Sequence, residues 1–508
     1  MTRILSTGGR CKDALASVAV LCALAGLTRD EIAAAERPPT SGVSTESRAA
    51  GGGPHAPPAG SWPQQGGCPQ HANFTHDSPA PPYSVAWIAD LAPEMIYAAQ
   101  PVVADRRVYH STLQGSVYAL DLNTGERLWH FKTGDCMWGG AAAGTAPYGG
   151  TGKVFVASWE GLVFGLDAKT GEKLWQFDAE ENISASPCVA DDSVFIGTRQ
   201  GTMLALSTGG QLQWKQKLSW NLYTSAAWNN GRVYAVTEDM VAHAMDARTG
   251  ALIWKSAQLA GLAIRDFYPV AHGGWVLVTT EPAVAAGKKQ TLPKEAIGRP
   301  VHNGERPTSL VQAEAALLEE LKDHPAMQTL FLLNESDGKQ PFVPLNFYGG
   351  AGLEQVNQPL TFDREGRLVR PCEMAGGMKV ARIDLVKNQV WDIMDEFQPS
   401  ATDNSEILSV GGTRVFSKNY IRGGHGQWAG FVFDYTHREM SQLPHRQVPA
   451  KRVSVVPLAW APSCPLSERR MGYAGEMWGI QGVSPTVIAG NRFYWVKQAQ
   501  QIIAVEGR

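Results

Sequence analysis

Short runs of alternating apolar and polar residues, separated by turns, fill most of this chain. The run "VYALDLNTGERLW" (117–129) begins with β-branched and aromatic residues that favour a strand. Asp121 can then accept hydrogen bonds from the turn backbone, Gly125 can adopt a positive φ at little cost, and Trp129 follows in a second strand. The stretch therefore predicts a β-hairpin with a large aromatic side chain just after its turn.

This hairpin recurs along the chain. The stretches "VFGLDAKTGEKLW" (163–175) and "VAHAMDARTGALIW" (241–254) repeat it, and two further predicted strands precede each copy. The closing tryptophans are spaced 46, 39 and 40 residues apart: Trp129, Trp175, Trp214 and Trp254. Four short antiparallel strands at a period near 40 are typical of a propeller blade. Since one such sheet cannot bury both faces, we expect each tryptophan to fill the wedge between neighbouring blades.

Four less regular units complete the array. Phe342 takes the tryptophan place in the fifth unit, and Trp391 closes the sixth. The last unit (484–507) has three strands, and its missing outer strand is available in "YSVAWIADL" (83–91), where Trp87 matches the repeated tryptophan. Joining the two ends leaves no unpaired edge between the first and last blades. The sequence thus predicts an all-β fold, a closed eight-bladed β-propeller of four-stranded antiparallel blades.

One insertion near 284–326 interrupts the strand pattern. Apolar residues recur there at helical spacing: Leu310, Ala313, Leu317 and Leu321. Thr308 is the expected N-cap, and Pro325 ends the run. We expect this helix to pack on its own ring, the alternative being a lid over the centre or a partner-docking element.

The N-terminal region indicates export. Residues 1–25 combine basic residues, a short apolar run and small residues at a cleavage position, as in a signal peptide. The run is shorter than the roughly 20 residues that span a bilayer, so no transmembrane span is predicted. Cys22 is a poor lipid-attachment site because the bulky Leu21 precedes it. Residues 26–60 are rich in Pro, Gly and Ser and predict a disordered linker, which leaves 61–508 for the propeller of a secreted or periplasmic protein.

Charge and cysteine usage exclude several function classes. The net charge is −3 and no dense Lys/Arg stripe is present, which argues against a nucleic-acid partner. The seven cysteines include no CxxC motif and no adjacent pair, which disfavours haem attachment and a zinc ribbon. We expect the cysteines to act mainly as small buried hydrophobes, with one or two disulfides possible in an oxidising compartment. A monomer is expected.

The repeated segments "ALDLNTGERLW", "GLDAKTGEKLW" and "AMDARTGALIW" resemble the pyrroloquinoline-quinone-like (PQQ-like) repeat. That repeat occurs in quinoprotein dehydrogenases and in the outer-membrane assembly lipoprotein of the β-barrel insertion machinery. The stretch "SWPQQGGCPQHANFT" (61–75) is similar to the lead-in of many secreted members, so the resemblance covers nearly the whole chain after residue 60. It implies a ligand site in the central funnel, where the innermost strands begin.

Aligning the repeats by these strand starts gives the residues expected at the mouth of the funnel: Met137, Trp138, Asn182, Trp220, Asn221, Tyr223, Arg265, Asp266, Glu354, Gln355, Asn357, Asn404, Glu406, Trp478 and Gln481. A quinone cofactor with Ca²⁺ needs carboxylate and amide oxygens and an aromatic ring for stacking. Asp266, Arg265, Glu354 and Asn357 are the candidate catalytic set, while the rings of Trp138 and Trp478 are the candidate cofactor contacts. The alternative is that these polar residues only line a water-filled channel. No dedicated metal-ligand set is predicted.

Two functional hypotheses follow. The first is a binding or scaffold protein, in cell-envelope assembly, that holds a protein partner or a small ligand at the funnel. The second is an oxidoreductase similar to the PQQ- and Ca²⁺-dependent alcohol dehydrogenases. The chain lacks the vicinal cysteine pair and the haem motif of those dehydrogenases, and its candidate carboxylates stand in different local sequences. The first hypothesis is therefore favoured, and nothing local selects a third, a hydrolase or lyase on the same ring.

Overall fold

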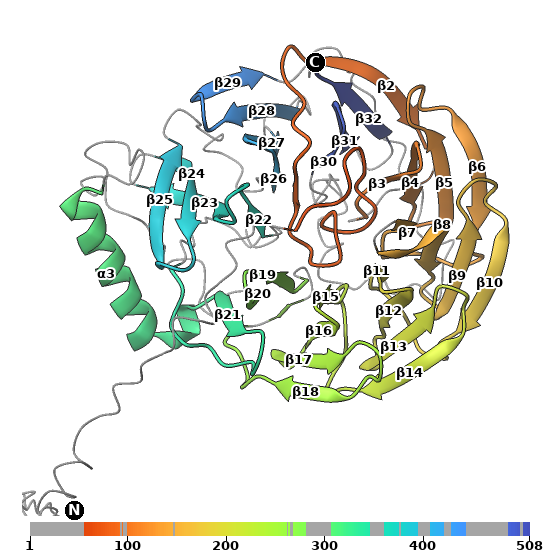
Figure 1. Ribbon diagram of the computed structural model, residues 1–508, viewed down its shortest axis with the longest axis horizontal. Coiled ribbons are helices and arrows are strands. Elements are labelled where there is room, and N and C mark those ends of the chain that lie inside the picture. Colours follow the sequence, from red (N-terminus) through yellow and green to blue (C-terminus); the bar gives the residue numbers. More distant parts are fainter. Residues whose placement is uncertain are drawn as a thin grey trace, which may run out of the picture. The chain divides into compact units, whose positions relative to one another are not determined.

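The structure is a computed structural model, and it describes residues 55–91, 94, 99–145, 148–261, 263–264, 268–280, 306–345, 360–374, 377–394, 407–420, 428–442, 486–497 and 501–508. The chain divides into two units, 1–51 and 52–508, and all described residues belong to the second. Within that unit the strands form eight sheets set around a common centre (Figure 1). The predicted eight-bladed propeller is confirmed.

The first four blades are regular four-stranded antiparallel sheets in which strands pair in chain order. Blade 1 contains β3 (Val102–Ala104), β4 (Arg107–Ser111), β5 (Ser116–Asp121) and β6 (Arg127–Lys132). Blade 2 contains β7 (Ala142–Thr145), β8 (Gly149–Ala157), β9 (Leu162–Asp167) and β10 (Lys173–Asp178). Blade 3 contains β11 (Cys188–Ala190), β12 (Ser193–Gly197), β13 (Thr202–Ser207) and β14 (Leu212–Lys217). Blade 4 contains β15 (Ala227–Asn229), β16 (Arg232–Thr237), β17 (Val241–Asp246) and β18 (Leu252–Lys255).

The other four blades follow the same plan with more variation. Blade 5 has three described strands, β19 (Val270–His272), β20 (Trp275–Thr279) and β21 (Leu330–Asn334). Blade 6 contains β22 (Thr361–Phe362), β23 (Leu368–Met374), β24 (Gly377–Asp384) and β25 (Gln389–Met394). Blade 7 contains β26 (Ile407–Gly411), β27 (Arg414–Tyr420), β28 (Trp428–Asp434) and β29 (Glu439–Gln442), and β1 (Phe74–Thr75) joins β26 in parallel. Blade 8 contains β30 (Val487–Ala489), β31 (Arg492–Lys497) and β32 (Gln501–Glu506).

The ring is closed by the N-terminal segment, as the sequence predicted. Strand β2 (Ser84–Asp90) pairs antiparallel with β32 and forms the outer strand of blade 8 (Figure 1). In this register Trp87 lies opposite Ala504, just after a one-residue bulge. Pairing of the two ends of the chain removes the edge that an open array would expose.

A tryptophan docks each of five blades on the next. The indole ring lies on the turn glycine of the following blade in these pairs: Trp87 on Gly125, Trp129 on Gly171, Trp175 on Gly210, Trp214 on Gly250 and Trp254 on Gly338. A Cβ on any of these glycines would lie 2.4–2.6 Å from the indole, and each glycine has a positive φ of 70–87°. The residue opposite the tryptophan in its own sheet is always small: Ala504, Ala119, Gly165, Ala205 and Ala244.

Each indole N–H also donates to a backbone carbonyl of the next blade at 2.9–3.1 Å: Leu122, Ala168, Thr208, Ala247 and Glu335. Glycine, small residue and tryptophan thus belong to one contact between blades, which explains why they recur together. A buried aromatic side chain contributes on the order of 2–3 kcal/mol. The predicted wedge role of the tryptophan is confirmed at these junctions.

Substitution of a glycine that contacts a docked tryptophan should destabilise the protein by more than its positive φ alone would. We expect Gly171→Ala to destabilise the protein by about 2–4 kcal/mol, because the new methyl group overlaps the Trp129 ring in addition to straining the backbone. Gly152 is the matched control, since its φ is +77° and no atom lies within 4 Å of its added Cβ. Gly152→Ala should cost about 1 kcal/mol. Equal urea midpoints for the two variants would contradict the docking account.

The junction between blades 6 and 7 differs from the prediction. Trp391 was expected to close blade 6, but the bulge places Asp392, not Trp391, opposite Arg382 in the docking position. Trp391 lies one residue earlier, where the Arg367 guanidinium packs 4.2 Å from its ring centre. The turn position that holds glycine elsewhere is Arg438, with a φ of +59°. The aromatic contact is therefore replaced by an ionic one.

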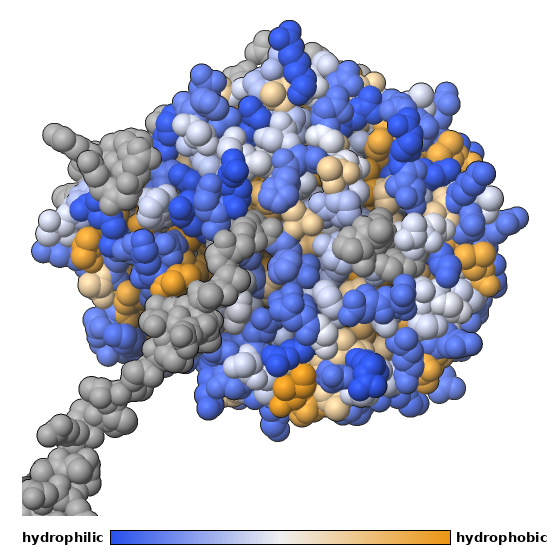
Figure 2. Space-filling model, in the orientation of Figure 1, coloured by the Kyte–Doolittle hydropathy of each residue, from blue (hydrophilic) through white to orange (hydrophobic). Residues whose placement is uncertain are grey.

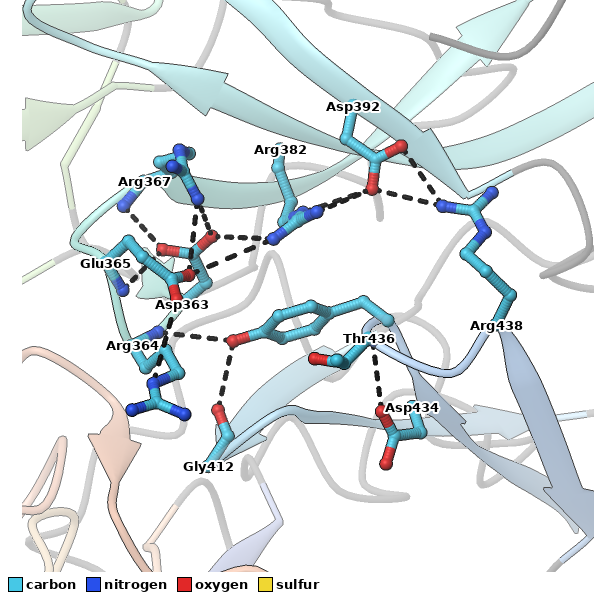
Figure 3. A network of polar contacts seen from close by, with 11 residues as sticks. Asp363, Arg364, Glu365, Arg367, Arg382, Asp392, Gly412, Asp434, Thr436 and Arg438 are labelled. Atoms are coloured by element: carbon cyan, nitrogen blue, oxygen red, sulfur yellow. Dashed lines mark hydrogen bonds and ion pairs between the residues drawn. The ribbon is translucent and has the colours of Figure 1, made fainter. Parts of the chain in front are cut away.

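Figure 3 shows this ionic junction, in which Asp392 lies between two arginines. Arg382 donates to Asp392 at 2.8 Å, and Arg438 donates to the same carboxylate at 3.1 Å. Arg382 also reaches Asp363 at 3.2 Å, and the Asp363 and Asp392 side chains are 0% and 3% exposed. Because these charges are shielded from water, each depends on its partner for solvation.

The predicted helix is α3 (Thr308–Asp323), followed by a short 3-10 helix (Pro325–Met327). Thr308 is its first residue rather than its N-cap; Pro307 holds the cap position with an extended backbone and no side-chain bond. Leu310, Leu317 and Leu321 are buried in the core cluster shared with blade 6. The helix lies beside β25, as Figure 1 shows, where Glu314 accepts a hydrogen bond of 2.8 Å from the Val390 amide. Packing on the ring is confirmed.

The centre of the ring is occupied by residues 61–77, here called the axial segment (Figure 1, orange). It touches the inner part of every blade in turn. Its partners from blade 1 to blade 8 are Val103, Ala143, Val189, Trp228, Ala271, Thr361, Leu408 and Gly490. Trp62, His71, Asn73 and Phe74 are fully buried. At the level of the inner strands, this segment therefore occupies the place of the open channel that was considered as an alternative.

Three buried histidines should make the stability of the fold pH-dependent. Burial lowers the pKa of His71 and His272 from 6.5 to about 4, and that of His110 to about 3. Below pH about 6.5 the unfolded chain therefore binds protons that the folded chain does not. Stability is fully present above that pH and is lost as the pH falls toward about 4.

Urea midpoints between pH 7.5 and 4.5 test this, with His110→Leu as the comparison. Neither His110 ring nitrogen has a hydrogen-bond partner in the described part of the chain. The variant should therefore keep its fold and show a pH slope smaller by about one proton. A wild-type midpoint that does not change over this pH range would contradict the assignment.

Candidate functional site

The antiparallel order of the blades gives the ring two different faces. Tight turns between first and second strands, and between third and fourth, lie on one face, here called the turn face. The connections into each inner strand, and those between second and third strands, lie on the other, here called the loop face. Figure 2 shows polar side chains over most of the face it displays, with apolar ones in small separate patches.

On the loop face of blades 2–4, three aromatic residues and an arginine form one contact series, here called the aromatic–arginine cluster. Trp138 precedes β7, Trp159 lies between β8 and β9, Arg199 between β12 and β13, and Tyr223 precedes β15. The two indole rings lie 6.0 Å apart. The Arg199 guanidinium lies 5.2 Å from the Trp159 ring and 3.7 Å from the Tyr223 ring, a cation–π arrangement on both sides.

Hydrogen bonds between neighbouring loops fix this cluster. The Asn182 amide donates to the Trp159 carbonyl at 3.0 Å, and the Asn182 carbonyl accepts from the Arg199 amide at 2.7 Å. Ser184 donates to the Tyr223 carbonyl at 3.4 Å. These bonds join the loops that carry Trp159, Arg199 and Tyr223, so these three side chains are positioned before any ligand arrives.

Trp220 lies on the same loop face, in the connection between β14 and β15. Its side chain is 56% exposed, a high value for a tryptophan. Its carbonyl packs closely against Gly201: a Cβ there would lie 2.4 Å from the Trp220 oxygen, and the φ of +85° favours glycine. Asn221 follows it, and its carbonyl accepts from the Glu238 amide at 3.0 Å. An exposed aromatic on a rigid loop is typical of a binding surface.

The structure brings together only some of the predicted site residues. Trp138, Asn182, Trp220, Asn221 and Tyr223 lie on this loop face. Met137 does not belong to it: its side chain is buried in the core between blades 1 and 2. The remaining predictions fall on residues outside the described part of the chain: Arg265, Asp266, Glu354, Gln355, Asn357, Asn404, Glu406, Trp478 and Gln481.

Sequence reasoning missed Trp159 and Arg199. It aligned only the starts of the inner strands, whereas these residues precede the glycine of the turn between second and third strands, in "SWEG" and "TRQG". Aligning Gly161 with Gly201 would have placed both on the same face. The repeat therefore contained the information needed to place Trp159 and Arg199.

Of the groups that a quinone with Ca²⁺ needs, the described residues supply only a part, since Asp266, Glu354 and Asn357 lie outside them. Trp138 could supply a stacking ring, but no group of three or more His, Cys, Asp or Glu that could hold a metal occurs among them. Cys68 and Cys188 are free and buried, as expected of small hydrophobes, whereas Cys136 is disulfide-bonded. We derive no reaction step through this cofactor. No helix in these ranges is long and apolar enough to cross a bilayer.

Comparison with known proteins relates the chain to one sequence family and one fold. The family described as outer membrane protein assembly factor BamB matches residues 113–261 and 159–306. A comparison with curated protein sequences finds no match. Among solved structures, quinohemoprotein alcohol dehydrogenase from Comamonas testosteroni is similar with a TM-score of 0.53 at 12% identity, over 88% of this chain and 81% of that one.

Two further solved structures are similar to this chain. The computationally designed Ika8 protein has a TM-score of 0.52 at 12% identity, over 84% of this chain and 99% of that chain. BamB from Moraxella catarrhalis has a TM-score of 0.49 at 12% identity, over 84% and 98%. At this level of identity the likeness concerns the architecture of the ring alone.

Proposed function

Because the chain is a β-propeller of the PQQ-like repeat superfamily, we propose that it is an exported binding protein that docks a protein partner in cell-envelope assembly. The partner binds the aromatic–arginine cluster and Trp220 on the loop face. The family match to an outer-membrane assembly factor supports this reading, since it covers residues 113–306 and so the blades that build the cluster. The signal-peptide pattern of residues 1–25 supports a secreted or periplasmic location.

One observation carries the proposal: large aromatic side chains and an arginine lie together on short, mutually bonded loops. Trp, Tyr and Arg are the residue types enriched among the few side chains that carry most of the binding energy at protein interfaces. The axial segment fills the centre of the ring, so this face offers a surface rather than a passage. A protein partner fits such a surface better than a substrate enclosed on the axis.

Site-specific photo-crosslinking in cells tests the docking face. A photoreactive amino acid at position 220 should give a crosslink to an envelope protein, and the same amino acid at Leu128, exposed on the outer rim, should give none. Crosslinks of equal yield at both positions, or at neither, would contradict the proposal. Periplasmic fractionation with N-terminal sequencing tests export separately.

Arg199→Ala should weaken this partner's binding about tenfold or more, because it removes the cation between two aromatic rings. Arg248, exposed in the β17–β18 turn on the opposite face, is the matched control, and Arg248→Ala should leave the affinity unchanged. The affinity is measured by titration with the crosslinked partner. An equal loss in both variants would point to a general effect of charge and contradict the assignment.

The oxidoreductase alternative has its own test. Mixing the purified protein with the quinone and Ca²⁺ and following dye-linked alcohol oxidation should give no activity above background. Activity that is lost on Glu354→Gln would replace the binding hypothesis with a catalytic one.

A further inference from the structure

Three polar side chains of the axial segment each use one atom to bind the ring. The Gln70 amide nitrogen lies 3.5 Å from the Asn229 side-chain oxygen. His71 Nδ1 lies 3.0 Å from the Pro269 carbonyl oxygen, and Asn73 Nδ2 lies 3.0 Å from the Leu408 carbonyl oxygen. Each side chain has a second polar atom that takes no part in these contacts.

The chemistry of the second atoms follows from the first. A backbone carbonyl only accepts hydrogen bonds, so the proton of the neutral His71 ring is on Nδ1 and the NH₂ of Asn73 faces Leu408. His71 Nε2 and Asn73 Oδ1 therefore offer only lone pairs. Both side chains are fully buried, and neither atom has a partner in the described part of the chain.

Two neighbouring groups are also buried without a hydrogen-bond partner in the described part of the chain. Gln70 Oε1 is buried without a partner, and so is the hydroxyl of Tyr268, whose ring lies edge-on at 4.6 Å from the His71 ring. Native proteins pair nearly all such groups, because a buried polar atom that loses water without regaining a bond is costly. Four of them around one short segment indicate a ligand rather than an accident of packing.

We propose that the axis of the ring holds ordered water molecules bound to His71 Nε2, to Asn73 Oδ1 and to the neighbouring Tyr268 hydroxyl. The ligand must donate hydrogen bonds, because the first two atoms are acceptors. It is neutral, because none of the polar groups named here carries a charge and an uncompensated buried ion is strongly disfavoured. It is small, because the axial segment and the inner strands fill the centre. Water meets all three conditions, and a second water oxygen can accept from Tyr268.

The water molecules complete the hydrogen bonding of the axial segment, so the ring centre is a fixed core made of protein and solvent. This inference does not depend on the proposed partner. A polar segment can thus take the place of an apolar one at the axis, because water satisfies the acceptor atoms that the strands do not reach.

A crystal structure of the full chain, at a resolution that shows waters, tests the proposal directly. We expect a water at about 2.7–3.2 Å from His71 Nε2 and another at Asn73 Oδ1. Absence of density at both atoms, a protein donor in their place, or a metal-like distance of about 2.4 Å would overturn it.

A pair of tyrosine variants tests the same point in solution. The Tyr109 hydroxyl donates directly to the Ala168 carbonyl, so Tyr109→Phe should lower the Tm by about 1–2 °C. If water pairs the Tyr268 hydroxyl, Tyr268→Phe should lower it by a similar amount. An unchanged or higher Tm for Tyr268→Phe would show an unpaired hydroxyl and would overturn the proposal.

Discussion

Replacing residues 61–77 by a Gly/Ser linker of equal length should prevent the protein from reaching its native ring. The change removes the buried side chains of Trp62 and Phe74, each of which contributes about 2–3 kcal/mol. It also removes four hydrogen bonds that side chains of the segment make to the ring, at about 1 kcal/mol each: two between Gln64 and Val189, one from Asn73 to Leu408 and one from Gly490 to Asp77. The total of about 10 kcal/mol is comparable to the whole stability of a typical protein, about 5–15 kcal/mol.

Circular dichroism and calorimetry measure the outcome. The variant keeps Ser84–Asp90, so that the outer strand of blade 8 is still supplied and only the axis is tested. The control replaces residues 36–52, a predicted linker, with the same Gly/Ser sequence and should leave the Tm unchanged. A cooperative transition of the 61–77 variant within a few degrees of wild type would show that the axial segment is dispensable.

Asp392→Ala should destabilise the protein by about 3–5 kcal/mol, the second-largest effect expected of the changes described. The carboxylate lies between Arg382 and Arg438, at 2.8 and 3.1 Å. Its removal takes away the carboxylate that two largely buried guanidinium groups share and leaves their like charges facing each other, with Asp363 still paired to Arg382. Such broken buried pairs are far more costly than the loss of an exposed pair.

The triple variant Arg382→Ala, Asp392→Trp and Arg438→Gly should recover most of this loss. It restores at junction 6/7 the small residue, tryptophan and turn glycine that dock five other junctions. Asp337→Ala is the control, since Asp337 pairs with Lys339 at an exposed site and its loss should change stability by less than about 0.5 kcal/mol. If Asp392→Ala behaves like Asp337→Ala, or the triple variant is less stable than Asp392→Ala, the ionic replacement is not what holds this junction.

Much of the ring was predictable from the sequence because one repeated segment contains the residues that form the main contact between blades. Hydrophobic alternation, the turn glycine and the tryptophan recur together, and Trp87 identified the strand that closes blade 8. The error at Trp391 has a clear physical cause. Docking requires the residue that follows the one-residue bulge. A tryptophan one position earlier, such as Trp391, therefore does not occupy the docking position. Arg438 at the glycine position was the sequence signal that this junction is ionic.

The axial segment was less accessible to sequence reasoning. Its Gln, Gly and Pro residues are typical of loops, and its bonds join distant positions, as between Gln64 and Val189. Contacts between such distant positions leave no periodic pattern in the sequence. The site was predicted in part, because strand starts located Trp138 and Tyr223, while Trp159 and Arg199 lie on a connection that the alignment did not use.

The central claim is that one N-terminal segment forms both the axis of the ring and the outer strand that closes it. Native-state hydrogen exchange followed by mass spectrometry tests this most directly. Peptides covering residues 62–76 and Ser84–Asp90 should exchange as slowly as those from β31 and β32. Exchange of either peptide within seconds, at the rate of an unstructured chain, would contradict the account.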